Sequence, residues 1–233
     1  RIDVILTADM ISQDQVKDKT AVVIDTLRAT STIVAALANG CQRIVPVIDV
    51  KEAQHLANRL GDDCLLAGER KGVQLPGFNV GNSPQSYNSK EIEDKVIVLT
   101  TTNGTKCFVQ LDEAKKVLVA SLLNLELLTE KLVAKEEIVF CCAGFRGEFA
   151  LDDFITAGKI IDLLSHRCQL ELADEALVAC QTYLANRHNL LSIIKRSNAG
   201  RNLISLGKED DIEYIVNNQF KVVPTYSNGE ITK

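Results

Sequence analysis

Residues 21–39 read AVVIDTLRATSTIVAALAN, and this stretch decides the fold. Its first part, 21–24, is a short apolar run rich in β-branched residues, which predicts a buried strand. Its second part, 32–39, has a helical pattern and ends in Asn39-Gly40, a pair typical of helix C-termini. A strand that leads directly into a helix is the building unit of parallel sheets, so the stretch favours an α/β fold.

The same alternation continues through the first 165 residues. Apolar, β-branched runs predict strands at 4–6, 21–25, 43–48, 64–67, 96–100, 116–120 and 138–142. Amphipathic stretches between them predict helices at 32–39, 49–60, 124–135 and 151–164. This order predicts an α/β fold, a three-layer α/β/α sandwich built on a mostly parallel sheet.

Beyond residue 165 the pattern becomes mainly helical. Helices are predicted at 174–186, 189–196 and 209–217, and one more strand at 220–224. The chain has only four prolines and no Ser/Gly-rich linker. We therefore expect a single domain over residues 1–233, with a helix-rich C-terminal third.

The composition excludes several classes of protein. With 46% hydrophobic and 24% charged residues, the chain is neither disordered nor fibrous. A net charge of −5 without a basic stripe argues against a nucleic-acid partner, and no apolar run approaches the ~18 residues of a membrane span. Seven cysteines form no CxxC pair and lie mostly in apolar runs, which indicates buried thiols of a reducing compartment. No basic-then-apolar leader opens the sequence, so we expect a cytoplasmic protein.

The stretch quoted first also carries a candidate site, because ligands of open α/β sheets bind beyond the carboxyl ends of the strands. Asp25 ends the strand, Arg28 follows three residues later, and Thr30 and Ser31 crowd the start of the helix. A carboxylate suits a hard cation, while arginine, hydroxyls and helix amides suit phosphate oxygens. The pattern favours a metal-and-anion site. The alternative is a plain helix cap with Arg28 paired to Asp25.

Polar residues follow the other predicted strands as well. These further candidates are Glu69, Asn82, Asn103, Gly104, Thr105, Arg146, Asp152 and Asp153. Each has an ordinary interpretation, since Asn-Gly is often a turn and acids in a first helical turn often only offset the helix dipole. Four polar strand ends in one sheet nevertheless favour a ligand site at that edge.

Familiar phosphate-handling signatures do not account for these residues. Asp25 is followed two positions on by Leu27, so a strand-Asp-x-Asp motif is absent. Cys141 and Arg146 are separated by one residue too few for the Cys-x5-Arg loop of cysteine phosphatases. Neither GxxxxGK[ST] nor GxGxxG occurs, and the three histidines suggest no ligand cluster.

Six short motifs occur in order along the chain. They are DTLRATST at 25–32, GER at 68–70, GNSP at 81–84, TTNGT at 101–105, CAG at 142–144 and AGRNL at 199–203. As a set, the chain resembles the 2-phosphosulfolactate phosphatase family over roughly residues 1–215. The resemblance implies an α/β/α sandwich and a Mg²⁺-dependent phosphatase that hydrolyses (R)-2-phospho-3-sulfolactate to 3-sulfolactate and phosphate, a step of coenzyme M biosynthesis.

With this resemblance, the candidate residues take specific roles. The catalytic residues are expected to be Asp25 and Arg28. The expected Mg²⁺ ligands are Asp25, Glu69, Asp152 and Asp153. The expected substrate-binding residues are Thr30, Ser31, Asn82, Asn103, Gly104, Thr105, Arg146 and Arg201. The attacking group is left open between a Mg²⁺-activated water and Asp25 itself.

The expected partner is a small anionic phospho-acid that carries about four negative charges at neutral pH. Self-association into a homo-oligomer is left open. Two alternatives to the main function also stay open at this point. One is a phosphatase of another 2-hydroxy-acid phosphate, such as phospholactate. The other is a non-catalytic anion-binding protein that uses the same polar loops.

Overall fold

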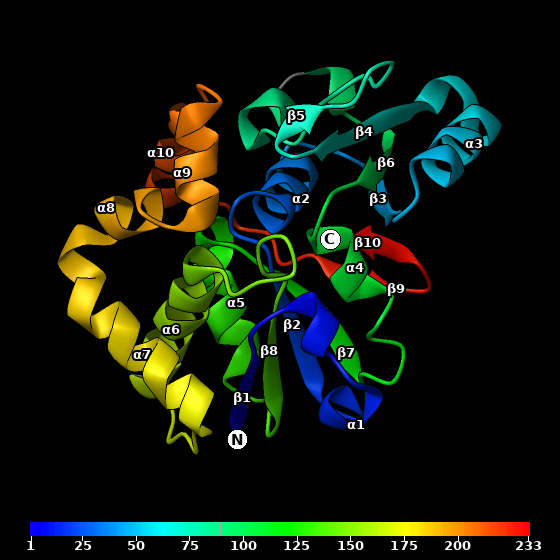
Figure 1. The fold of residues 1–233 in the computed structure, drawn as a ribbon. Coiled ribbons are helices and arrows are strands. Elements are labelled where there is room, and N and C mark those ends of the chain that lie inside the picture. The colour runs from blue at the N-terminus through cyan, green and yellow to red at the C-terminus, as the bar shows by residue number, and fades with distance from the viewer. Residues whose placement is uncertain (89) are drawn as a thin grey trace.

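A ten-stranded sheet runs through the computed structural model, which describes residues 1–88 and 90–233 (Figure 1). Its strand order is β1-β8-β2-β7-β9-β10-β3-β6-β4-β5. The strands are β1 (Ile2–Ile5), β2 (Thr20–Ile24), β3 (Arg43–Pro46), β4 (Cys64–Arg70), β5 (Val73–Gln74), β6 (Val96–Thr100), β7 (Lys116–Ala120), β8 (Ile138–Cys142), β9 (Thr225–Ser227) and β10 (Glu230–Thr232). The strands β1, β8, β2 and β7 pair in parallel, as do β3, β6 and β4, so the predicted mostly parallel sheet is confirmed.

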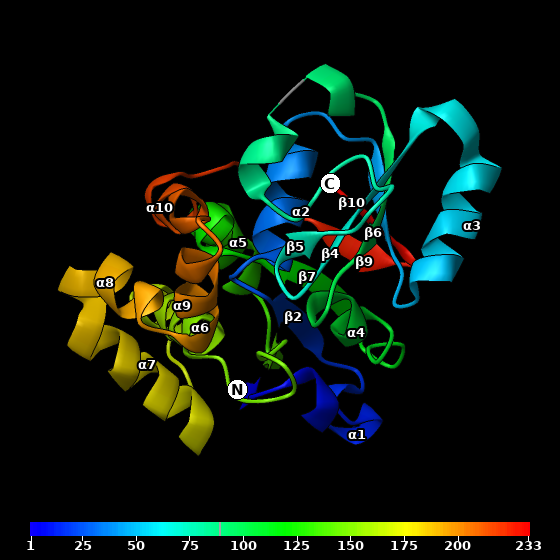
Figure 2. The ribbon, with the colours of Figure 1, turned by 45° about the horizontal axis from the view of Figure 1, so that its top comes forward.

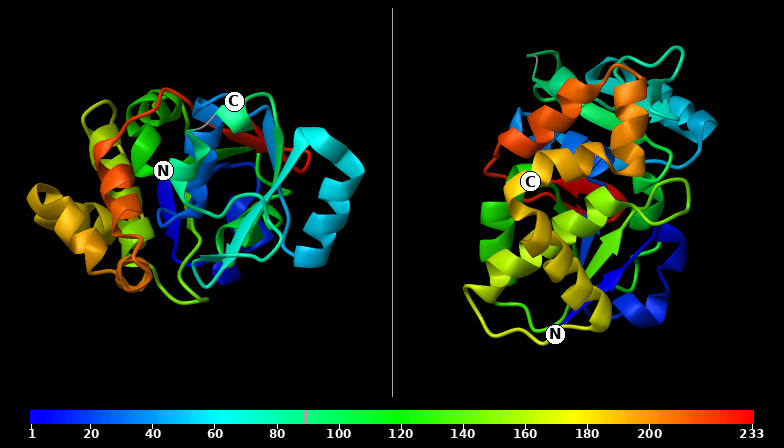
Figure 3. Two further views of the ribbon diagram at one scale, coloured as in Figure 1. Left: turned by 90° about the horizontal axis from the view of Figure 1, so that it is seen from above. Right: turned by 60° about the vertical axis from the view of Figure 1, so that its left-hand side comes forward.

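Helices cover both faces of this sheet, as a three-layer sandwich requires. They are α1 (Gln13–Val16), α2 (Ala29–Ala38), α3 (Val50–Leu60), α4 (Gly104–Phe108), α5 (Leu125–Leu132), α6 (Leu151–Ser165), α7 (Asp174–Asn186), α8 (Leu190–Lys195), α9 (Asn198–Ser205) and α10 (Glu209–Asn217). Seen from above, α3 lies on one side of the molecule and α9 and α10 on the opposite side (Figure 3). The expected helix-rich C-terminal third is confirmed by α7–α10.

Alternate residues of β2 face opposite layers, as the two-residue period of a strand dictates. Ala21 and Val23 pack into the core that contains α2 and α4, whereas Val22 and Ile24 pack into the core that contains α5 and α6. Because both faces are covered, every residue of β2 is buried, which explains its uninterrupted apolar run. This central position fixes Asp25, the next residue, at the carboxyl edge of the sheet.

The strand predicted at 220–224 is wrong. Residues 220–224 form an irregular connection with a bend at Lys221, and β9 begins only at Thr225. Here β9 and β10 form a hairpin around Asn228 and Gly229, whose φ angles of +51° and +80° suit the tight turn that an Asn-Gly pair favours. The hairpin lies between β7 and β3 and joins the two parallel parts of the sheet (Figure 2).

Short 3₁₀ turns complete the chain path. They are η1 (Ala8–Met10), η2 (Gly61–Asp63), η3 (Pro84–Tyr87), η4 (Lys90–Ile92), η5 (Leu122–Asn124) and η6 (Arg187–Asn189). Among the described residues, no helix has the length and apolar character needed to cross a membrane.

Candidate active site

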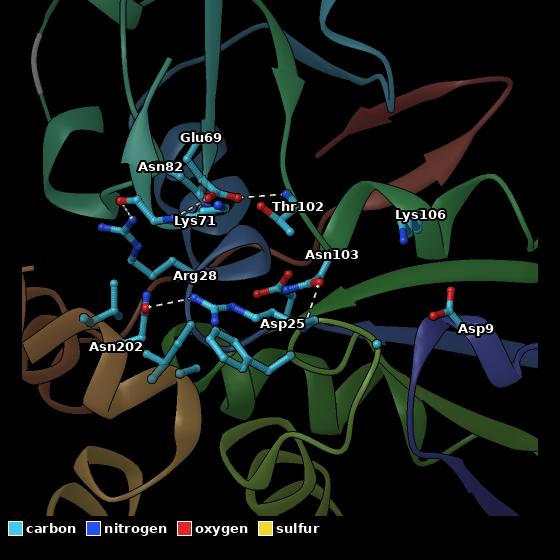
Figure 4. A pocket seen from close by; sticks show the side chains of 17 residues that line it. Asp9, Asp25, Arg28, Glu69, Lys71, Asn82, Thr102, Asn103, Lys106 and Asn202 are labelled. Carbon is cyan, nitrogen blue, oxygen red and sulfur yellow. Dashed lines mark hydrogen bonds between the residues drawn. The ribbon is translucent and has the colours of Figure 1, made fainter. Parts of the chain in front are cut away.

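A cavity of about 420 Å³ opens where several strand ends meet, which is where parallel sheets bind ligands (Figure 4). The segments that form it follow β2, β6 and β8, and the turn from β4 to β5 and helix α9 complete it. Its lining residues are Asp9, Asp25, Leu27, Arg28, Glu69, Lys71, Gly72, Asn82, Thr102, Asn103, Lys106, Phe145, Arg146, Gly147, Ala199, Asn202 and Leu203. The cavity is of a size that suits a small molecule.

Asp25 is held at the start of α2. Its Oδ1 accepts a 3.1 Å hydrogen bond from the backbone N–H of Ala29. The Thr30 hydroxyl accepts from the backbone N–H of Asp25 at 3.0 Å and donates to its carbonyl at 2.8 Å. Burial raises the pKa of Asp25 to about 7, and the nearby carboxylates of Asp152 and Glu69 add to the rise. No described residue donates a hydrogen bond to Oδ2, so this oxygen is available to a ligand.

Glu69 joins two of the loops that form the cavity. Its Oε1 accepts from the backbone N–H of Thr102 at 2.8 Å, and its Oε2 accepts from the backbone N–H of Gly72 at 2.6 Å. Both carboxylate oxygens are thus engaged by backbone donors in the structure. Glu69 lines the cavity and fixes the β4–β5 turn against the segment that follows β6.

Arg28 lines the cavity but does not pair with Asp25. Its Nη1 donates to Oδ2 of Asp211 at 2.6 Å, and its Nη2 donates to the carbonyl of Gly72 at 3.0 Å. The sequence pattern left open an Asp25–Arg28 pair, and the structure places the partner of Arg28 on α10 instead. Nothing in the sequence around Asp211 marked it as part of this region.

Asp152 and Asp153 begin α6 and are both buried outside the cavity lining. The Asp153 carboxylate accepts from the backbone N–H groups of Thr26, at 2.7 Å, and Gly144, at 3.1 Å. It therefore ties the segments after β2 and β8 together. Oδ1 of Asp152 is buried and finds no partner among the described residues. Burial raises the pKa of Asp152 to about 6.

Four predicted small residues, Thr30, Ser31, Gly104 and Thr105, lie inside the protein rather than in the cavity wall. The Ser31 hydroxyl donates to the carbonyl of Thr26 at 2.7 Å, and the Thr105 hydroxyl donates to the carbonyl of Thr101 at 3.2 Å. The Thr30 hydroxyl is bonded to the backbone of Asp25. Gly104 starts α4 and lies directly against Asp25. The direct substrate contacts expected of these residues stay predictions.

The predicted amides and arginines divide into two groups. Asn82, Asn103 and Arg146 line the cavity, and Oδ1 of Asn82 is buried with no partner among the described residues. Arg201 is exposed and bonds to the Arg196 carbonyl and to Asn198, outside the cavity lining formed by the described residues. Its neighbour Asn202 points into the cavity instead and accepts from Nη2 of Arg146 at 3.3 Å (Figure 4).

Several lining residues were missed by the sequence analysis, above all Asp9, Lys71, Lys106 and Asn202. A usable signal existed for Lys71. Lys71-Gly72 and Arg146-Gly147 each occupy a two-residue turn in which both residues have positive φ angles, between +56° and +85°. A cation followed by glycine just past a strand therefore marks both turns.

The described residues do not provide a complete set of metal ligands at the cavity. Among the described residues, no three His, Cys, Asp or Glu side chains gather closely enough to hold a metal ion alone. Two carboxylate oxygens lack hydrogen-bond donors among the described residues: Oδ2 of Asp25, a residue of the cavity lining, and the buried Oδ1 of Asp152, which lies outside that lining. Mg²⁺ commonly takes one or two carboxylates and completes its shell with water and substrate phosphate. The residues present fit that mode.

Comparison with known proteins decides the family. A family model described as 2-phosphosulpholactate phosphatase matches residues 5–229. The chain belongs to this family. A protein of Clostridium acetobutylicum named probable 2-phosphosulfolactate phosphatase is 42% identical over 234 residues, which cover 99% of each chain. A protein of the same name from Clostridium tetani is 39% identical over 99% of this chain and 99% of its own. Another, from Clostridium beijerinckii, is 39% identical over 100% of this chain and 99% of its own.

Membership in the 2-phosphosulpholactate phosphatase family confirms two expectations from the sequence. The resemblance carried by the six motifs is correct, and the protein is an enzyme of the phosphoric monoester hydrolase class. The match at 5–229 includes every cavity-lining residue, from Asp9 to Leu203. The cavity is therefore the candidate active site of this phosphatase.

Proposed function

We propose that the protein is a Mg²⁺-dependent phosphatase that hydrolyses (R)-2-phospho-3-sulfolactate to 3-sulfolactate and phosphate. The observation that carries this proposal is the family match over nearly the whole chain, 5–229. The cavity agrees with it, because a small phospho-acid fits its volume of about 420 Å³. In line with the family resemblance, we assign the step to coenzyme M biosynthesis.

The charges of the cavity suit such a substrate. Arg28, Lys71, Lys106 and Arg146 line it together with three acids, Asp9, Asp25 and Glu69. Phosphate, carboxylate and sulfonate together carry about four negative charges at neutral pH. Four cationic side chains and one divalent cation provide a local positive field in a chain whose net charge is −5.

Mg²⁺, when bound, neutralises phosphate oxygens and helps to hold the phosphate in place. Asp25 and Asp152 are the residues that would hold it, because each offers a carboxylate oxygen that accepts no hydrogen bond from the described residues. Glu69 and Asp153 instead orient the loops, since backbone N–H groups engage both of their carboxylates. This division of roles narrows the four ligands expected from the sequence to two.

Asp25 is the residue at which the chemistry is centred. The Ala29 N–H fixes Oδ1 of its carboxylate, and Oδ2 accepts no hydrogen bond from the described residues, in a residue that lines the cavity. In this position Asp25 either attacks phosphorus itself or orients the attacking water. Arg28 donates its remaining N–H groups to a phosphate oxygen, where charge grows as the ester bond breaks.

The test is phosphate release from a panel of phospho-acids, with Mg²⁺ and with excess chelator. The panel contains 2-phospho-3-sulfolactate, 2-phospholactate and phosphoglycolate, and the variant Asp25→Asn serves as the inactive reference. Asp62→Asn, an exposed carboxylate far from the cavity, is the matched control. We expect Mg²⁺-dependent release with the highest kcat/KM for 2-phospho-3-sulfolactate.

Other outcomes separate the alternatives. A higher kcat/KM for phospholactate would indicate a phosphatase of another 2-hydroxy acid. Binding without release from any ester would indicate an anion-binding protein. Full turnover in chelator would remove Mg²⁺ from the proposal. Borohydride, which reduces an acyl phosphate on Asp25 but not a free carboxylate, distinguishes attack by Asp25 from attack by water.

A further inference from the structure

Arg28 and Asp211 form a buried ion pair between segments that are 183 residues apart. Arg28 is 4% exposed and Asp211 is 2% exposed, and Nη1 lies 2.6 Å from Oδ2. A buried ion pair is costly to build and adds little stability compared with an apolar pair of the same size. Its presence beside the cavity therefore calls for a reason other than stability.

Asp211 is held from three sides. Its Oδ1 accepts from the Ser83 hydroxyl at 2.5 Å and from Nε2 of Gln85 at 3.0 Å, while Oδ2 accepts from Arg28. It also lies in the first turn of α10, where the helix dipole favours a negative charge. These contacts fix the carboxylate before any ligand arrives.

The guanidinium of Arg28 is fixed in turn. Nη1 bonds to Asp211 and Nη2 bonds to the carbonyl of Gly72. A guanidinium has five N–H donors, so the remaining donors are left for a ligand in the cavity that Arg28 lines. Two fixed bonds to a planar group determine the direction of the others.

The competing partner of Arg28 is Asp25, three residues earlier in the chain. Both residues line the same cavity, so the Asp25 carboxylate is the acid next to which the Arg28 guanidinium would otherwise lie. A direct Arg28–Asp25 pair would occupy the carboxylate that the ligand needs. In the structure the guanidinium pairs with the Asp211 carboxylate instead.

We infer that Asp211 is a positioning residue of the active site, which holds the Arg28 guanidinium away from Asp25 and aims its free N–H groups at a phosphate oxygen. This inference rests on the proposed phosphatase function. It brings α10, from the C-terminal third, into the catalytic arrangement without any contact between Asp211 and substrate. Ser83 and Gln85 serve the same purpose one step further out, because they hold Asp211.

The decisive experiment is chemical rescue of Arg28→Ala by added guanidinium. We expect added guanidinium to raise the activity of Arg28→Ala at least ten-fold, because Asp211 holds the free ion in the place of the missing side chain. In the double variant Arg28→Ala/Asp211→Asn we expect no rescue. Equal rescue in both backgrounds would overturn the inference, since a merely structural Asp211 would not affect capture of the ion.

Steady-state kinetics give a second readout. Asp211→Asn is expected to lower kcat by 10- to 100-fold with a smaller change in KM, and the double variant is expected to be no slower than Arg28→Ala alone. Asp210→Asn, an exposed neighbour in the same helical turn, is the matched control. Retention of more than half of the wild-type kcat by a folded Asp211→Asn enzyme would contradict the proposed role.

Two further measurements keep the inference testable if Asp211→Asn misfolds or if turnover is low. If Asp211→Asn fails to fold, Ser83→Ala removes one donor from Asp211 and leaves the ion pair in place, and we expect a two- to ten-fold loss of kcat. Unchanged kcat in Ser83→Ala would then count against the inference. Titration with inorganic phosphate reports on Arg28 independently of turnover. Weaker phosphate binding by Asp211→Asn supports the inference even if the true substrate is a different ester, whereas unchanged binding contradicts it.

Discussion

Gly104 lies against Asp25 so closely that a Cβ at position 104 would stand 2.7 Å from Oδ2 of Asp25 and 2.6 Å from the Cβ of Ala29. Real Cβ atoms essentially never approach other atoms so closely, so only glycine fits at position 104 without a shift of Asp25 or Ala29. The start of α4 and the start of α2 can meet at the Asp25 carboxylate only because one side chain is absent. The Asn-Gly pair at 103–104 is thus more than a turn.

Gly104→Ala is expected to displace the Asp25 carboxylate and lower kcat by at least ten-fold, because overpacking shifts neighbouring groups by tenths of an ångström or more. Gly61→Ala is the contrasting control. At Gly61 no atom lies within 4 Å of an added Cβ, but φ is +75°, so the change should lower the melting temperature and leave kcat intact. Normal activity of Gly104→Ala would show that the carboxylate tolerates the added carbon.

Asp25→Asn is expected to inactivate the enzyme and at the same time to stabilise it at neutral pH. The pKa of Asp25 rises from 3.8 to about 7 in the folded protein, mainly through burial. A carboxyl with a raised folded pKa contributes stability that is complete below about pH 4 and is lost as the pH rises through 7. The asparagine side chain does not ionise, so Asp25→Asn does not lose stability in this way as the pH rises.

At pH 8 the free energy of unfolding of Asp25→Asn should exceed that of the wild type by at most about 4 kcal/mol, since each pKa unit corresponds to about 1.4 kcal/mol. Repulsion shared with Asp152 makes the difference smaller. Denaturant unfolding at pH 4.5 and pH 8 measures this difference. The wild type should also gain more melting temperature from Mg²⁺ than Asp25→Asn does. Equal stability of the two proteins at pH 8 would show that Asp25 is not strained by its burial.

Arg146→Lys and Lys71→Ala are expected to raise KM for 2-phospho-3-sulfolactate by 10- to 100-fold. Each loses about 1.5–3 kcal/mol of charged hydrogen bonding to the groups distal to the phosphate. Both residues come from two-residue turns at the cavity, and Asn202 bonds to the Arg146 guanidinium. The KM for 2-phospholactate, which lacks the sulfonate, should rise less.

The controls for these two variants are exposed residues outside the cavity lining, Arg167→Lys and Lys51→Ala. Equal KM increases for both substrates would place Arg146 and Lys71 at the phosphate. An unchanged KM for both substrates would remove Arg146 and Lys71 from substrate recognition.

Iodoacetamide is expected to leave the enzyme active. Burial raises the pKa of the Cys141 thiol to about 12, and it raises those of Cys107 and Cys142 well above 9. The nucleophilic thiolate form is therefore scarce at neutral pH in all three residues. Residual activity after alkylation, with mass spectrometry of the modified peptides, checks this expectation. Rapid inactivation that substrate slows would point to a cysteine in the site.

The sequence predicted the parts of this protein that depend on local patterns. The strands at 96–100, 116–120 and 138–142 and the helices at 174–186 and 209–217 agree with the structure residue for residue. The edge of the sheet that carries the site was predictable too, because polar residues follow buried strands there. Asp25, Arg28 and Glu69 come together at this edge for that reason.

What escaped prediction depends on contacts between distant segments. Asp211 looks like an ordinary acid of a first helical turn, and only the packing of α10 beside η3 brings it to Arg28. Similarly, the motif at 199–203 directed attention to Arg201, but the orientation of α9 points Asn202 into the cavity. The hairpin after Thr225 was marked by Asn228-Gly229, a signal that the sequence analysis did not use.

The insertion of β9 and β10 between β7 and β3 affects the nascent chain on the ribosome. The edge of β3 exists as soon as Pro46 has been made, but its antiparallel neighbour is made only after Thr225. At roughly 5–20 residues per second, translation leaves that edge and the edge of β7 unpaired for many seconds. Unpaired edges attract other strands. The nascent chain therefore needs protection from aggregation, by chaperones or by temporary contacts of its own, throughout most of its synthesis.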